Sequence, residues 1–195
     1  SLSGQDGQGL RVLRFCREER RQLGVVYVPG EQGHALARVG TLSHLIAITE
    51  APEQLAGMQL VVGSGRFKIL QLHQDRAFLE ATIRLWPWRE QPAPSWTVVE
   101  RVGDYLYRYT QALADLMPPA LMPDLLEPEP SALGVLAAAI LPIAEMEKQT
   151  LLELSSAKAL LHAVLRYLRL HVPLAEQLAA MPPPEAGVYE RILLN

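Results

Sequence analysis

The chain has 195 residues, which is enough for one domain with a sizeable core or for two small domains. Its 18 basic and 21 acidic side chains give a net charge of −3, without the positive excess that favours nucleic acid or an anionic membrane as a partner. Cys16 is the single cysteine, so the composition excludes an intramolecular disulfide and a multi-cysteine metal site and predicts a reducing, cytoplasmic setting.

Residues 10–94 are predicted to form a β-rich subdomain behind a flexible lead of residues 1–9. A short amphipathic helix is predicted over residues 10–21. Aliphatic and β-branched runs separated by Gly, Pro and polar clusters then indicate strands at residues 23–28, 37–50, 58–65, 66–72 and 78–86. This spacing is typical of an antiparallel meander or barrel. Gly63-Ser64-Gly65 is interpreted as a hairpin turn between two of these strands.

Residues 95–174 are predicted to form a helical subdomain, because the period of the apolar residues changes from two to 3.6. The pattern places helices at residues 97–117, 131–141, 143–154 and 157–171, followed by a tail over residues 175–195. Ser131 is expected to cap the second helix, and Ser155 or Ser156 the fourth. The apolar run of residues 133–144 is too short to cross a bilayer. The predicted fold class is therefore α+β.

Motifs for catalysis or cofactor binding are not found in the sequence. It lacks the motifs GxxxxGK[ST], GxSxG and HExxH. The sequence therefore predicts no ATPase phosphate-binding loop, no nucleophile elbow of an α/β-hydrolase and no zinc-binding helix of a metalloprotease. His162 and His171 fall on opposite sides of one predicted helix and cannot share a metal ion. No catalytic residue, cofactor or metal is therefore predicted, which favours a protein that is not an enzyme.

Ser155, Ser156 and Lys158 allow one catalytic alternative, because a lysine of lowered pKa can activate a serine hydroxyl. The same residues are also what a helix start requires, with serine as N-cap and lysine in the solvated first turn. The capping interpretation is favoured over a Ser-Lys hydrolase.

Three tryptophans, Trp86, Trp88 and Trp96, bracket the connection between the predicted sheet and the predicted helices. Grouped aromatic side chains at such a junction either pack between subdomains or anchor a partner. These three residues are the predicted peptide- or partner-binding site.

Six segments, in order and at similar spacing, resemble the N-terminal substrate-binding domain of the ATP-dependent protease Lon, a module also found alone in short bacterial proteins and in cereblon. The segments are residues 23–28 (LGVVYV), 39–42 (VGTL), 60–69 (LVVGSGRFKI), 130–133 (PSAL), 141–143 (LPI) and 147–154 (EKQTLLEL). The resemblance covers about residues 10–171. It implies an N-terminal antiparallel β pseudo-barrel followed by a C-terminal helical bundle.

The resemblance further implies recognition of unfolded or extended polypeptide segments, without proteolysis, and a role as adaptor or regulator in protein quality control. A protease or chaperone is a possible partner under this interpretation. One departure is that the family opens with a proline- and leucine-rich strand, which residues 10–21 do not show. If that strand is absent, a sheet edge is left to accept an extended peptide by strand addition.

A small-molecule sensor in the manner of cereblon is the other alternative. The tri-tryptophan cage of cereblon belongs to a different domain, so Trp86, Trp88 and Trp96 are not equated with it.

Overall fold

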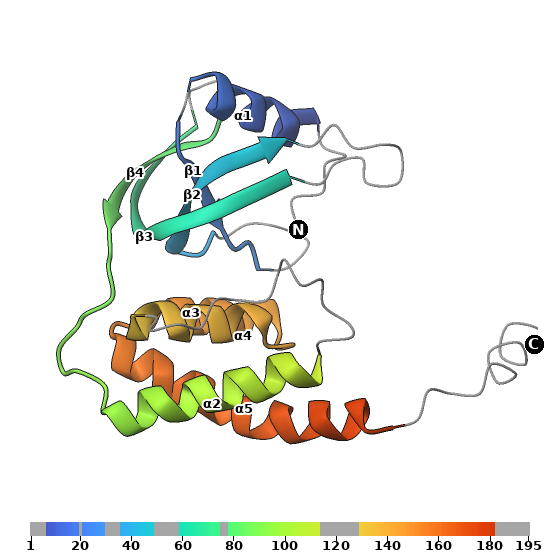
Figure 1. Cartoon of the computed structure of the whole chain (residues 1–195). Helices are drawn as coiled ribbons and strands as arrows, with labels where there is room; N and C mark the ends of the chain where they lie inside the picture. Colours follow the sequence, from blue (N-terminus) through green and yellow to red (C-terminus); the bar gives the residue numbers. More distant parts are fainter. Residues whose placement is uncertain are drawn as a thin grey trace, which may run out of the picture. The chain divides into compact units, whose positions relative to one another are not determined.

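The computed structural model describes residues 7–19, 21–29, 36–48, 59–74, 78–113 and 129–181. The chain divides into two compact units, which we call the sheet unit (Ser1–Trp88 and Ala144–Glu153) and the helical unit (Arg89–Ile143 and Leu154–Asn195). Figure 1 shows strands in the first and packed helices in the second, so the predicted α+β class is confirmed. The predicted subdomain boundary at residues 94 and 95 stays a prediction.

The sheet unit contains four strands, β1 (Leu23–Val26), β2 (Val39–Ile48), β3 (Gln59–His73) and β4 (Glu80–Leu85). They pair in the order β1-β2-β3-β4, and each pair is antiparallel. The predicted meander is therefore confirmed. The described strands form an open sheet with β1 and β4 at its two edges, rather than the closed pseudo-barrel.

The Gly63-Ser64-Gly65 segment lies inside β3, so the predicted hairpin at this point is wrong. Leu42 of β2 pairs with Gly65 and Ser43 pairs with Gly63, which leaves Ser64 as the extra residue of a β-bulge. The Ser64 hydroxyl donates a hydrogen bond to the carbonyl oxygen of Leu42 at 3.2 Å. The bulge interrupts the pairing register without ending the strand.

Phe67 occupies the centre of the sheet and is only 2% exposed. Its ring fills the space above two glycines of neighbouring strands, Gly24 and Gly40. A Cβ at Gly40 would lie 2.6 Å from the Phe67 ring and 2.6 Å from the carbonyl oxygen of Val25. Glycine is therefore required at position 40 by this close approach of ring and backbone.

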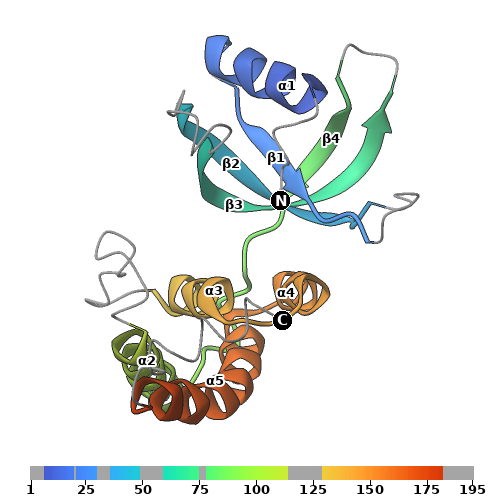
Figure 2. The ribbon, with the colours of Figure 1, turned by 90° about the vertical axis from the view of Figure 1, so that its right-hand side faces the viewer.

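Helix α1 (Gly7–Glu18) precedes the strands and begins three residues before its predicted start at Leu10. It lies across the concave side of the curved sheet (Figure 2). Leu13 and Cys16 are buried, and the ring of Phe15 lies 5.2 Å from that of Phe78. Burial raises the pKa of the Cys16 thiol, which keeps it in its neutral form at neutral pH.

Helix α4 (Glu145–Leu152) belongs to the sheet unit although it is distant from the strands in sequence. The side-chain amide of Gln149 donates to the carbonyl oxygen of Val39 at 3.1 Å. Leu151 is 3% exposed. At the start of the helix, the Glu147 carboxylate accepts a hydrogen bond from the backbone N–H of Ala144 at 3.0 Å.

The helical unit is formed by α2 (Trp96–Ala112), α3 (Pro130–Ile140) and α5 (Ala157–Ala179). A parallel bridge joins Arg89 to Ser156, and from there α2 and α5 run side by side in the same direction (Figures 1 and 2). Apolar side chains fill the space between the helices. The largest fully buried ones are Val102, Leu106, Leu141, Leu160, Leu161, Val164, Leu168 and Val172.

Two predicted helix caps have different outcomes. Ser156 caps α5, with its hydroxyl oxygen accepting the backbone N–H of Ala159 at 3.2 Å, as predicted. Ser131 is not a cap, because α3 begins one residue earlier, at Pro130. Proline is favourable there because the first N–H groups of a helix have no hydrogen-bond partner within the helix. The Ser131 hydroxyl instead donates to the Glu129 carboxylate at 2.6 Å.

Helix α5 runs to Ala179 rather than ending at His171 as predicted. Pro173 lies inside the helix, and the residues around it continue the apolar face, with Val172 and Ala175 both buried. Burial of this face offsets the hydrogen bond that proline removes. The connection between the predicted helices of residues 97–117 and 131–141, and the end of the predicted tail, lie mostly outside the described residues.

Candidate functional site

Two of the three predicted site residues flank a single cation in the sheet unit. The Arg66 guanidinium carbon lies 3.1 Å from the ring centre of Trp88 and 4.4 Å from that of Trp86. The Lys68 ammonium lies 3.7 Å from the ring centre of Trp86. Lys68, Trp86, Arg66 and Trp88 therefore alternate as cation and aromatic ring, an arrangement that we call the cation–indole stack. Each contact is stabilised by the negative face of the ring.

The pairing of β3 with β4 brings these residues together. The backbone N–H of Trp86 donates to the carbonyl oxygen of Arg66 at 2.8 Å, and Lys68 stands opposite Arg84. Alternate residues of a strand share a face, so Arg66, Lys68, Arg84 and Trp86 lie on the same side of the sheet. Phe67 lies on the other side, in the core.

Arg66 holds the stack against helix α4. Its side chain is 6% exposed, and its guanidinium donates a hydrogen bond to the carbonyl oxygen of Leu152. Burial lowers the pKa of Arg66 to about 10, which still leaves the side chain charged at neutral pH. The stack is therefore a fixed, charged surface feature with one buried cation at its base.

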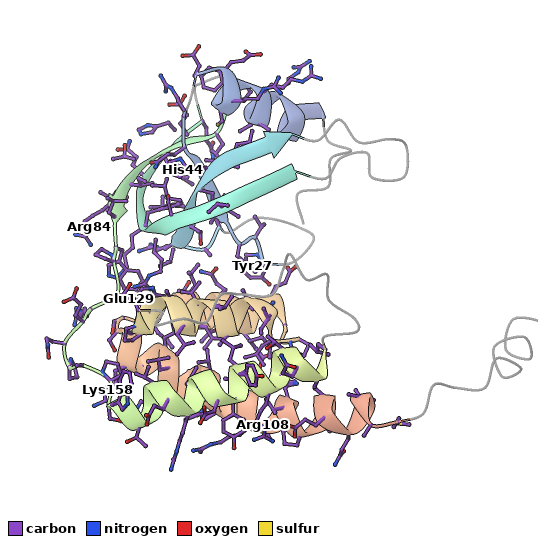
Figure 3. The ribbon with its side chains drawn as sticks, in the orientation of Figure 1. Tyr27, His44, Arg84, Arg108, Glu129 and Lys158 are labelled. Carbon is purple, nitrogen blue, oxygen red and sulfur yellow. The ribbon has the colours of Figure 1, made fainter. Side chains whose placement is uncertain are left out.

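A hollow of about 490 Å³ opens beside the stack, and we call it the sheet hollow. It is lined by Arg38, Val39, Lys68, Ile69, Leu70, Arg84, Trp86 and Glu153. Three of these side chains are basic, one is acidic, and the Trp86 ring supplies a flat apolar surface. Figure 3 shows Arg84 projecting from the β4 ribbon. The hollow combines an aromatic contact surface with donors for carboxylate or carbonyl oxygens.

The β4 edge of the sheet borders this hollow. Among the described residues, β4 pairs only with β3. Because Trp86 donates its N–H toward β3, the alternation of an antiparallel ladder directs the N–H groups of Leu85 and Ile83 away from β3. Leu85 is 62% exposed. An extended chain laid along this edge could accept those two hydrogen bonds.

The third predicted residue, Trp96, belongs to the helical unit, whereas Trp86 and Trp88 belong to the sheet unit. It is the first residue of α2 in the helical unit and is 72% exposed. Within the sheet unit, the structure thus brings Trp86 and Trp88 together around Arg66.

Sequence reasoning missed the basic members of the site, Arg66, Lys68 and Arg84. In the predicted strand of residues 66–72, Arg66 and Lys68 alternate with Phe67 and Ile69, which by itself indicates only a polar strand face. The available signal was their two-residue spacing on one strand, matched by Arg84 and Trp86 on the next, which places all four on one face.

The alternative catalytic residues do not form a site in the described part of the chain. The hydroxyl of Ser156 accepts the capping hydrogen bond from Ala159. Lys158 extends from the start of α5 (Figure 3), with no hydrogen bond to Ser156. Within the described ranges, no group of three His, Cys, Asp or Glu side chains could hold a metal ion. No helix in that part of the chain is long and apolar enough to span a membrane.

The model of the family described as "ATP-dependent protease La (LON) substrate-binding domain" matches residues 10–169. No curated protein matches the chain by sequence.

Solved structures of low sequence identity share the fold. The N-terminal domain of the Mycobacterium avium complex Lon protease is 16% identical, with a TM-score of 0.64 over 86% of this chain and 88% of that one. A Lon N-terminal domain protein from Xanthomonas campestris is 17% identical, with a TM-score of 0.58 over 83% of this chain and 84% of that one.

Proposed function

The chain belongs to the LON substrate-binding domain family, and from that premise we propose that it binds unfolded or extended polypeptide segments without cleaving them. We further propose that it acts as an adaptor or regulator in protein quality control, with a protease or chaperone as a partner. The observation that carries the proposal is the match of the family model over residues 10–169. A cytoplasmic setting remains a prediction from the single cysteine.

The proposed binding mode uses the β4 edge together with the sheet hollow. A polypeptide in extended conformation accepts the outward N–H groups of Ile83 and Leu85, which provides affinity independent of its sequence. One of its side chains then lies against Trp86, and Lys68 and Arg84 bind a nearby carboxylate or carbonyl oxygen. Such a site accepts many sequences and prefers segments that are already unfolded.

A proline at position 85 tests the edge directly. Leu85→Pro removes an N–H that points away from β3, so the β3–β4 ladder keeps its hydrogen bonds. We expect this variant to bind an unfolded polypeptide at least tenfold more weakly, measured by fluorescence anisotropy. Leu85→Ala is the matched control, because it removes the exposed side chain but keeps the N–H. Equal affinities of the two variants would rule out strand addition at β4.

Tryptophan replacements test the side-chain part of the site. Trp86→Ala is expected to weaken binding of the same polypeptide, because an aromatic anchor is a frequent source of binding energy. Trp96→Ala removes an exposed indole of the helical unit, and a similar loss of affinity there would assign Trp96 to the site as first predicted. Circular dichroism of each variant controls for loss of fold.

Absence of turnover is tested by prolonged incubation with the unfolded polypeptide, followed by mass spectrometry. We expect the polypeptide to remain intact. Cleavage that disappears in the Ser156→Ala/Lys158→Ala double variant would replace the binding proposal with the Ser-Lys hydrolase.

Affinity capture from the native cell tests the adaptor role, which requires a protease or chaperone among the captured proteins.

A further inference from the structure

The helical unit has a hollow of its own, of about 500 Å³, which we call the helix hollow. It is lined by Val98, Arg101, Leu154, Ala159, His162, Ala163, Leu165, Arg166 and Arg169. His162, Arg166 and Arg169 follow each other at spacings of four and three residues, so they share one face of α5, and Arg101 faces them from α2. The remaining lining is apolar. The helix hollow therefore joins an apolar surface to a concentrated positive charge, in a chain whose net charge is −3.

Within the described part of the chain, these arginines are not neutralised by neighbouring side chains. Among the described residues, no carboxylate lies within salt-bridge distance of Arg101, Arg166 or Arg169. Arg108, further along the same pair of helices, is different. It forms two 2.8 Å hydrogen bonds with the carboxylate of Glu176, and this pair also joins α2 to α5. Of the side chains that the structure describes, Glu176 thus pairs with the arginine that stabilises the helix packing, and no carboxylate pairs with the three arginines of the helix hollow.

We propose that the helix hollow is a second binding site, for an acidic protein segment in which an apolar side chain is flanked by carboxylates. The apolar side chain would lie against the partly exposed Val98, Leu154 and Ala159, and the carboxylates would pair with Arg101, Arg166 and Arg169. A guanidinium binds a carboxylate through two parallel hydrogen bonds, so three such groups select both the charge and the spacing of the segment. This site is independent of the proposed polypeptide binding at β4.

Charge and shape favour an acidic protein segment over nucleic acid. A nucleic acid needs an extended basic track or aromatic rings on which bases stack, and its affinity comes mainly from many phosphate contacts. The lining of the helix hollow contains three arginines and one histidine, but no Phe, Tyr or Trp ring. A short segment with one apolar side chain matches both the charge and the apolar lining.

The test uses two fluorescein-labelled dodecapeptides, one with leucines flanked by Glu and Asp, the other with Gln and Asn in their place. We expect the full chain to bind the acidic peptide, and the neutral peptide at least tenfold more weakly. The Arg166→Glu/Arg169→Glu variant should bind the acidic peptide at least tenfold more weakly than the unmodified chain. Higher salt should weaken the interaction as well, because these cations are exposed.

The matched control is Arg14→Glu/Arg17→Glu on α1, which changes the net charge equally at two exposed arginines of the sheet unit. It should bind the acidic peptide as the unmodified chain does. An equal loss of affinity in both double variants would overturn the proposal, since net charge alone would then explain binding. Arg166→Gln/Arg169→Gln is the milder replacement, and unchanged affinity in this variant would equally overturn it.

A single-stranded dodecanucleotide serves as the competing anion. The proposal fails if the oligonucleotide binds the chain as tightly as the acidic peptide and its binding is lost in the Arg166→Glu/Arg169→Glu variant. The helix hollow would then be a general polyanion site.

The Leu85→Pro variant separates this proposal from the polypeptide-binding function. It should keep full affinity for the acidic peptide even though its affinity for the unfolded polypeptide is reduced.

Discussion

The two units of this chain are stabilised by different means. All of the largest fully buried side chains among the described residues, including Leu106, Leu161 and Leu168, lie in the helical unit. Among the described residues, the sheet unit buries fewer apolar side chains, such as Leu13 and Leu151. It adds a few specific contacts, namely Phe67 above its glycines and Arg66 between two indoles. The comparison indicates that the helices provide general, non-directional stability, whereas the sheet keeps charged and aromatic groups in fixed positions at its surface.

The largest expected effect is a cavity in the helical unit. Leu168 is fully buried, so Leu168→Ala should lower the free energy of unfolding by roughly 2–5 kcal/mol. Urea denaturation monitored by circular dichroism measures this change. The exposed Leu170 provides the control, because Leu170→Ala removes the same atoms from the surface of the same helix and should cost little. Similar losses in the two variants would show that α5 does not form the core of the unit.

Glycine-to-alanine replacements should have opposite signs in the two units. Gly40→Ala places a Cβ 2.6 Å from the Phe67 ring, and overpacking of this kind costs roughly 1–3 kcal/mol. Gly103→Ala in α2 meets no atom within 4 Å, and alanine stabilises a helix interior by roughly 0.5–1 kcal/mol relative to glycine. Thermal unfolding of both variants should show one lowered and one raised midpoint. A raised midpoint for Gly40→Ala would contradict the packing of Phe67 described above.

Replacement of Arg66 by lysine separates charge from shape in the cation–indole stack. Lysine keeps the positive charge but loses the planar group that lies between Trp86 and Trp88. We therefore expect Arg66→Lys to lower the free energy of unfolding by about 1 kcal/mol and to change the tryptophan fluorescence. Lys68→Arg is the control, since arginine can still lie over Trp86. An unchanged emission spectrum for Arg66→Lys would show that the stack does not persist in solution.

The smallest expected effect concerns the ion pair between α2 and α5. The hydrogen bond from Arg108 lowers the pKa of Glu176, so the pair stabilises the fold above the ordinary glutamate pKa and loses this contribution as the pH falls through the lowered value. Glu176→Gln should therefore be slightly less stable than the unmodified chain at neutral pH and equal to it in acid. Unfolding midpoints at both pH values measure the difference. A difference that grows on acidification would have the wrong sign for this explanation.

The sequence predicted the element types well because apolar periodicity reports which face of a helix or strand is buried. It predicted a turn at Gly63-Ser64-Gly65 because glycines usually end a strand, whereas here pairing with β2 on both sides of Ser64 keeps the strand intact. The predicted end of α5 at His171 was wrong for a related reason. Pro173 is a helix breaker in isolation, and burial of Val172 and Ala175 outweighs it.

The candidate site could be predicted only in part. The grouping of Trp86 and Trp88 was visible in the sequence because they are alternate residues. The participation of Arg66 was not, because a basic residue in a strand is normally solvent-exposed. Burial of Arg66 depends on β4 and on α4, which is distant in sequence, and local pattern does not report such contacts. The helix hollow was missed because its cations lie on two helices whose pairing the sequence alone does not fix.

Hydrogen exchange of backbone amides tests the central claim most directly. The full chain is compared with and without an unfolded polypeptide of neutral net charge, and exchange is followed by mass spectrometry. Binding at the sheet edge predicts slower exchange in residues 80–86, unchanged exchange in residues 157–172, and an intact polypeptide after the experiment. Unchanged exchange in residues 80–86 while the polypeptide is bound, or its cleavage during the incubation, would contradict recognition without turnover at this edge.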